Sequence, residues 1–180
     1  VTGVQTCALP ILIMLTMTFF LSCGQESKFI ANEPETIKPT PFELTISEKG
    51  GYSVPFGIHY VLTEKALVVT HKGEMVGKKD SILFSTIIEP NPSIDKLANL
   101  DMDRLEEFYY NPCVKDGSQI WVSYTQGNKS KKIHLSNFYH SDIGLAVETI
   151  NQLTPGELNI RYDKEELLKN QKLCEEAMKK

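Results

Sequence analysis

Residues 118–136 read SQIWVSYTQGNKSKKIHLS, and this stretch decides the class of fold. Apolar residues alternate with polar ones from Ile120 to Tyr124, and again from Lys132 to Ser136. Successive side chains of a strand point to opposite faces, so each run predicts a strand with one buried face. The intervening Gly127-Asn128 is a turn signal, and the two runs together predict an antiparallel hairpin.

Four segments upstream carry strand signals as well. Phe42–Ser47 alternates apolar and polar residues. Ile58–Leu62 and Ala66–His71 are rich in Val, Leu and Tyr and flank a three-residue turn, which predicts a second hairpin. Ser81–Ile88 predicts a further strand before the chain is broken by prolines.

Helices are predicted on both sides of the later hairpin. Ser93 is expected to cap a short helix. A second helical stretch is predicted after Asp101, because Leu105, Phe108 and Tyr109 recur at a spacing of three to four residues.

Two more helices are predicted toward the C-terminus. Ser141 or Asp142 is expected to cap the first of them, which Pro155-Gly156 ends. The last helix is expected to begin at Asp163, where Glu166 completes a start that resembles a capping box. Strands without alternating crossover helices indicate an α+β protein. We therefore expect one domain over residues 42–180, an antiparallel sheet with helices packed on one face.

The N-terminal segment shows two kinds of non-domain sequence. Val1–Ile11 resembles a translated sequencing adapter, so it is left out of the fold interpretation and the native start is expected to be missing. Residues 12–22 form an apolar run about half as long as the ~20 residues that a membrane span needs. A run of that length is typical of the apolar core of a signal peptide, here truncated.

The apolar run ends in Phe20-Leu21-Ser22-Cys23, which resembles the lipobox of bacterial lipoproteins, with Phe20 where Leu is more usual. The resemblance implies cleavage before Cys23 and lipidation of its sulfur, which would anchor the protein to a membrane. An ordinary secretory signal with an incidental cysteine is the alternative. Residues 23–41 then make up the lipidated cysteine and a polar, proline-containing tether.

Residues Gly57–Leu153 also carry a resemblance to a family. The region from Leu105 through Tyr109 to Asp116-Gly117, leading into a hairpin and a closing helix, resembles small uncharacterised envelope lipoproteins of Bacteroidota. The resemblance implies a cell-envelope protein. Because Gly24-Gln25-Glu26-Ser27 gives no decisive sorting signal, the periplasmic face of the outer membrane is the default location. The resemblance brings no catalytic residues with it.

Two cysteines, Cys113 and Cys174, fall within the predicted domain. The bacterial envelope is oxidising, so a disulfide between them is expected to be permitted. The alternative is two separate buried thiols, because a free cysteine packs like a small apolar residue.

Composition and motifs exclude several function classes. The net charge is −4 and the basic residues are scattered, which argues against a nucleic-acid partner. The histidines and cysteines lack the spacings of common metal sites, so no metal or cofactor is expected. His140-Ser141-Asp142 contains the three residue types of a catalytic triad. A triad is defined by geometry and not by adjacency in sequence, so a helix cap is the preferred interpretation of these residues.

Three aromatic residues, Trp121, Tyr109 and Tyr139, are candidates for a binding surface. Trp121 should point away from Ile120 and Val122, so it either lies on a solvated sheet face or is buried by a helix on that face. We expect the second arrangement.

Two functions remain open on this reasoning. The first is a binding or assembly module that is anchored to the membrane and contacts an envelope protein or polymer. The alternative is a small hydrolase or ligand-binding protein with a site that forms only on folding. A pocket with converging polar groups would favour the alternative, and a flat apolar patch around Trp121 would favour the first.

Overall fold

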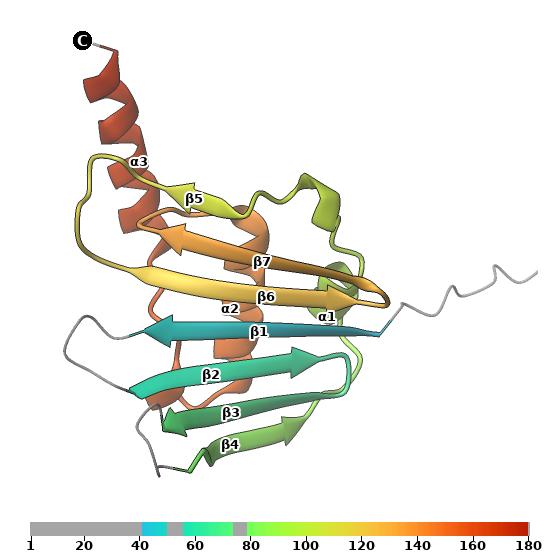
Figure 1. Ribbon diagram of the computed structural model, residues 1–180. Coiled ribbons are helices and arrows are strands. Elements are labelled where there is room, and N and C mark those ends of the chain that lie inside the picture. Colours follow the sequence, from blue (N-terminus) through green and yellow to red (C-terminus); the bar gives the residue numbers. More distant parts are fainter. Residues whose placement is uncertain (1–40, 50–55, 74–78, 180) are drawn as a thin grey trace, which may run out of the picture. The chain divides into compact units, whose positions relative to one another are not determined.

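The computed structural model of the chain describes residues 41–49, 56–73 and 79–179 (Figure 1). The adapter-like segment, the signal segment, Cys23 and nearly all of the tether lie outside these residues. Cleavage, lipidation and tethering therefore stay predictions. Within the described residues, no helix is both long and apolar enough to cross a membrane.

The described residues form one sheet of seven strands in the order β4-β3-β2-β1-β6-β7-β5. Neighbouring strands run antiparallel, except that β5 runs parallel to β7. The strands are β1 (Phe42–Lys49), β2 (Phe56–Thr63), β3 (Ala66–Gly73), β4 (Ser81–Ile87), β5 (Phe108–Tyr110), β6 (Gln119–Gln126) and β7 (Lys129–Ser136). Both predicted hairpins are confirmed, and β1 is the strand that joins them.

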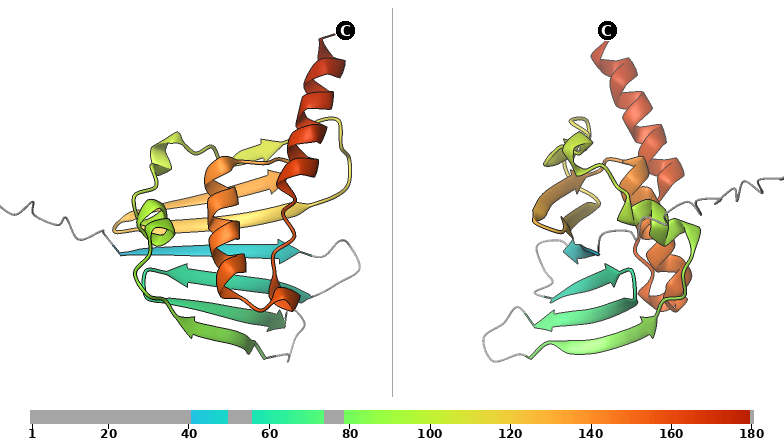
Figure 2. Two further views of the ribbon diagram at one scale, coloured as in Figure 1. Left: turned by 180° about the vertical axis from the view of Figure 1, so that it is seen from behind. Right: turned by 90° about the vertical axis from the view of Figure 1, so that its right-hand side faces the viewer.

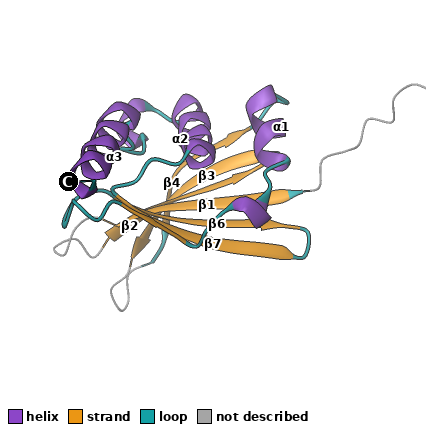
Figure 3. Ribbon diagram, turned by 90° about the horizontal axis from the view of Figure 1, so that it is seen from above, coloured by secondary structure: helices purple, strands orange, loops and turns teal. Residues whose placement is uncertain are grey.

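The three helices of the described residues lie on the same side of the sheet (Figures 2 and 3). They are α1 (Pro92–Ala98), α2 (Ser141–Leu153) and α3 (Lys164–Met178), with single 3-10 turns at Met102–Arg104 (η1) and Gly156–Leu158 (η2). The predicted fold class is therefore confirmed as α+β, a mostly antiparallel open sheet with its helices on one face.

The core fills the layer between the sheet and the helices. Leu44 and Ile46 of β1 are fully buried there, and Ile143 and Ile150 of α2 are fully buried as well. Burying one such side chain contributes about 1.5–3 kcal/mol. The apolar half of each alternating strand thus determines which face the helices cover.

The first two helix caps differ from those expected. Asn91, not Ser93, caps α1: its side-chain oxygen accepts from the backbone N–H groups of Ser93 and Ile94, each at 3.1 Å. Pro92 can then occupy the first helical position, where its missing N–H costs nothing. His140, not Ser141 or Asp142, caps α2, because its Nδ1 accepts from the N–H of Asp142 at 3.3 Å.

The cap of the last helix is confirmed. The Asp163 carboxylate accepts from the N–H of Glu166 at 2.9 Å, and α3 begins at the next residue, Lys164.

The predicted helix after Asp101 is wrong. The chain makes only the short turn η1 and then forms the strand β5 beside β7. Three consecutive aromatic residues favour a strand, because aromatic side chains lose rotamer freedom in a helix. The outer edge of β7 supplies the pairing: His134 N donates to Glu107 O at 2.9 Å, and Asn111 N donates to Ser136 O at 3.0 Å.

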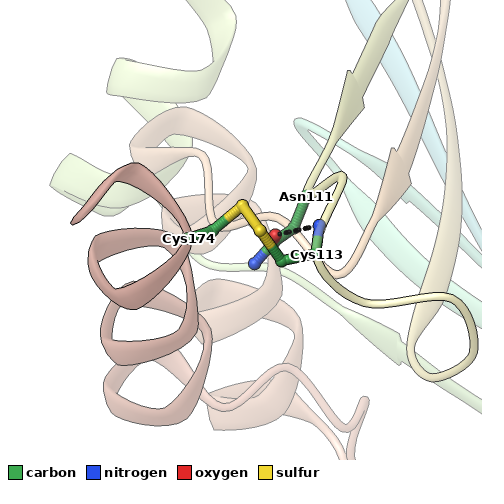
Figure 4. Close-up of a disulfide and its surroundings, with 3 residues drawn as sticks. All are labelled: Asn111, Cys113 and Cys174. Atoms are coloured by element: carbon green, nitrogen blue, oxygen red, sulfur yellow. Dashed lines mark hydrogen bonds between the residues drawn. A yellow bond between two sulfur atoms is a disulfide. The ribbon is translucent and has the colours of Figure 1, made fainter. Parts of the chain in front are cut away.

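A disulfide joins Cys113, in the turn after β5, to Cys174 of α3, with the two Cα atoms 5.6 Å apart (Figure 4). The side chain of Asn111 accepts from the Cys113 N–H at 3.0 Å and fixes this turn. Of the two arrangements that the sequence left open, the structure has the bonded one. The bond holds the surface helix α3 to the edge of the sheet.

Candidate functional site on the open sheet face

The sheet face opposite the helices, called the open face below, carries a continuous row of side chains. Ser47 of β1 pairs with His59 on one side and Trp121 on the other. Trp121 pairs with His134 of β7, which pairs with Phe108 of β5. Directly paired residues share a face, so these five side chains lie side by side on the open face.

The expectation that a helix buries Trp121 is wrong. The described helices all lie on the other side of the sheet (Figure 3), and Trp121 is half-buried by its neighbours on the open face. The His134 ring stacks on the indole, with ring centroids 4.5 Å apart and planes inclined by 9°. Trp121 is therefore a surface aromatic held in a fixed orientation.

The other two predicted aromatics do not join Trp121. Tyr109 packs toward the helices, against Phe138 and His140, with ring centroids 5.4 and 4.8 Å away. Tyr139 stacks on Tyr162, with ring centroids 5.4 Å apart, at the base of α3. The three candidates thus fall on different sides of the sheet.

Sequence reasoning missed Phe108 and Tyr110, which extend the aromatic row. Phe108 is 48% exposed and Tyr110 is 54% exposed, and their rings stack with centroids 5.1 Å apart. The Phe108 ring also lies 5.1 Å from that of His134. Phe108 was predicted to lie in a helix, and a helix would not place its ring beside Trp121.

A shallow hollow of about 260 Å³ lies on the open face beside Trp121. Its volume is slightly below the ~300 Å³ at the lower end of small-molecule sites, so it suits one ring or one side chain. Its lining consists of Thr45, Ser47, Glu107, Trp121, Val122, Ser123, Lys132, Ile133 and His134. Apolar surface dominates this lining, three residues contribute hydroxyls, and Lys132 and Glu107 contribute opposite charges.

His134 is the polar group best placed to meet a ligand in this hollow. Burial lowers the pKa of His134 below its ordinary value, so the neutral ring is favoured. Its Nε2 is buried and has no hydrogen-bond partner within the described part of the chain. A neutral imidazole can donate from one nitrogen and accept at the other. A ligand that reaches into the hollow could supply the missing partner.

A second, polar groove of about 620 Å³ lies beside the N-terminus of α3. It is lined by Val114, Asp116, Gly117, Ser118, Asn137, Arg161, Tyr162, Asp163, Glu166, Leu167 and Asn170. Tyr162 serves the structure here: its hydroxyl accepts from His140 N at 2.8 Å and donates to Phe138 O at 3.0 Å. Burial is the main cause that raises the pKa of this phenol.

Asn137 and Gly117 shape this groove. Asn137 adopts a left-handed backbone with φ of 53°, which asparagine tolerates better than most residues. Gly117 has φ of 143°, and a Cβ on it would come within 2.2 Å of Asn137 Oδ1, so only glycine fits. The Asn137 side chain is buried, and its Nδ2 has no partner within the described residues. This amide is a second donor that a ligand could satisfy.

The remaining sequence candidates have structural roles or form no cluster. His140 caps α2 and does not face Ser141 and Asp142 as a triad would. Ser47 and His59 form one hydroxyl–imidazole contact of 2.8 Å between β1 and β2. Across the described residues, no group of three or more His, Cys, Asp or Glu side chains could hold a metal ion.

Fold and site together define a class: an α+β protein that covers one sheet face with helices and presents an aromatic hollow on the other. Neither protein-family models nor curated proteins match the chain.

Proposed function

We propose that this chain is a lipid-anchored binding module of the bacterial envelope, and that its open face is the binding surface. The observation that carries the proposal is the hollow beside Trp121, on a sheet face that no described helix covers. Aromatic residues in fixed orientations are strong binding anchors, because they bury much surface with little loss of conformational freedom.

The chemistry of the hollow indicates what kind of partner it fits. Lys132 and Glu107 are the two residues of its lining with a formal charge, and their signs cancel. A strongly charged polymer would find no complementary field here. The hydroxyls of Thr45, Ser47 and Ser123 suit hydrogen bonding. The expected partner is therefore an envelope protein or polymer segment with little net charge, which places a ring or an apolar group against Trp121.

A photo-crosslinking amino acid at Ser123, in the lining, tests this in full-length protein in its native membrane. The matched control position is Glu148, which is exposed on α2. We expect one reproducible product from position 123, none from position 148, and loss of the product on Trp121→Ala but not on Thr125→Ala. The same product from both positions, or no product from either, contradicts the proposal.

The second candidate function, a small-ligand binder or hydrolase, is favoured by one observation. The polar groove at α3 contains the buried and unpartnered amide of Asn137. A buried donor without a partner costs about 1–3 kcal/mol, which a bound acceptor would recover.

A thermal-shift panel of free amino acids and monosaccharides on the full chain examines this candidate. A ligand for the groove should raise the melting temperature of the wild type and not that of Asn137→Gly. Glycine keeps the left-handed backbone of position 137 accessible and removes only the amide. An unchanged shift in Asn137→Gly excludes the groove as the site of that ligand.

A further inference from the structure

Strand β4 ends the sheet, and its outer edge has no neighbour among the elements that the structure describes. No described helix or strand lies beside that edge (Figures 1 and 2). An edge strand presents unpaired backbone N–H and C=O groups that can pair with another chain. Natural sheets usually protect such edges with charged residues, prolines, bulges or a covering element.

The sequence of β4 has little of this protection. Residues 81–88 read SILFSTII, with no charge and no proline. The side chains of Ile82, Leu83 and Ile87 are 70%, 45% and 82% exposed. One bulge is present, since Val69 pairs with Phe84 and Thr70 with Ile82, which leaves Leu83 between them. The regular part of the edge therefore begins at Phe84.

The hydrogen bonds to β3 show which groups of β4 point outward. Ile88 N donates to Lys65 O at 2.9 Å, so the backbone of Ile88 faces β3. Bonding direction alternates along an antiparallel strand, so Phe84 and Thr86 also face β3. Ser85 and Ile87 consequently present their N–H and C=O groups to the outside.

We propose that this edge binds a second copy of the same chain, with β4 pairing antiparallel to β4 about a two-fold axis at Thr86. In this register Ser85 of one copy lies opposite Ile87 of the other, and each such pair exchanges both backbone hydrogen bonds. Thr86 lies opposite Thr86 of the second copy in a pair without hydrogen bonds.

The side chains of this register are self-complementary. Phe84 lies opposite Ile88 of the second copy on the helix side of the sheet, and such aromatic–aliphatic pairs stabilise a ladder. No charged residue occurs between Phe84 and Ile88, so no like charges oppose each other. One residue beyond this segment, Glu89 of one copy lies opposite the uncharged Leu83 of the other. The contact is closed at this edge, because pairing uses the β4 edge of both copies and leaves no β4 edge to recruit a third copy.

Cysteine crosslinking tests the register in the full-length chain in its membrane. Thr86→Cys should give a disulfide-linked dimer under mild oxidation, because Cα atoms in such a pair are about 4.5 Å apart, within disulfide range. Ser85→Cys is the matched control. It lies on the same edge but opposite Ile87, so the two introduced thiols are diagonal neighbours, about 7–8 Å apart, and should crosslink several-fold less.

Two proline variants distinguish a dimer formed by strand pairing from disulfides formed by random collision of the chains. Ser85→Pro in the Thr86→Cys background removes an outward N–H and leaves the bonds to β3 in place, and proline is tolerated there on an edge strand. Ile87→Pro removes the other outward N–H. Both should abolish the dimer without lowering the melting temperature of the chain.

Three results would overturn the proposal: no dimer from Thr86→Cys, equal dimer from Ser85→Cys, or a dimer that persists in a folded proline variant. Where both proline variants fail to fold, the comparison of positions 85 and 86 decides alone. The native Cys113–Cys174 bond is internal, so the dimer is recognised by its mass on a non-reducing gel.

Discussion

The two faces of the central strands differ completely, although they alternate along the same few residues. Leu44 and Ile46 of β1 face the helices and are 0% exposed, whereas Thr45 and Ser47 face outward and are partly exposed. The period of two in the sequence assigns one face to the core. The other face carries hydroxyls, the imidazoles of His59 and His134 and the single tryptophan, and these side chains are only partly buried.

The helix-covered face is where the largest effects on stability are expected. The double variant Cys113→Ser, Cys174→Ser should lower the free energy of unfolding by roughly 4 kcal/mol, because the disulfide closes a loop of 61 residues in the unfolded chain. Helix α3 buries only Leu167 and Cys174, so apart from the disulfide few contacts hold it to the rest of the domain. Urea denaturation of the oxidised wild type and of the double variant measures the difference in the free energy of unfolding. Reduced wild type should match the double variant, and a loss below about 1 kcal/mol would contradict the expectation.

Adjacent substitutions on β1 give the sharpest test of the difference between the faces. Leu44→Ala should cost about 2–5 kcal/mol, because it leaves a cavity in the core. Thr45→Ala, one residue on and facing outward, should change stability by less than about 1 kcal/mol. Urea unfolding gives the free energy of unfolding of both variants, and its slope against urea concentration should stay that of the wild type. Similar losses at the two positions would mean that the open face is covered in solution.

The smallest expected effect concerns His134 and pH. Burial lowers the pKa of His134, so the unfolded chain takes up this proton first as the pH falls. The stability that neutral His134 provides is therefore present above pH ~6.5 and is lost as the pH falls from there toward the lower pKa of the folded state. His134→Phe should keep the aromatic contact and flatten this part of the pH profile of unfolding.

Fluorescence gives an independent readout of the same titration. Trp121 is the single tryptophan of the chain and stacks on His134, so its emission should change with a midpoint below pH ~6.5. The Phe variant should lack this transition. A transition that remains in His134→Phe would assign it to another group.

Elements with their own internal signal could be predicted from the sequence. The hairpin of β6 and β7 and the Asp163 cap follow from local patterns, and the structure has both. β5 could not be predicted, because three residues form a strand only when an existing edge such as β7 pairs with them. The missed strand also removed Phe108 from the predicted site. Trp121 stays a candidate binding residue, and the prediction that a helix buries it was wrong, because whether helices cover the second sheet face as well is a tertiary property that no local pattern encodes.

The position of β1 has a mechanical consequence. The strand that continues directly from the proposed tether lies in the middle of the sheet, hydrogen-bonded to β2 on one side and to β6 on the other. A pull on the chain ahead of Phe42, directed along the strand, would load both ladders in shear. Their bonds would then have to rupture together rather than unzip one after another. The domain would thus resist a force applied at this end of the chain with both ladders at once.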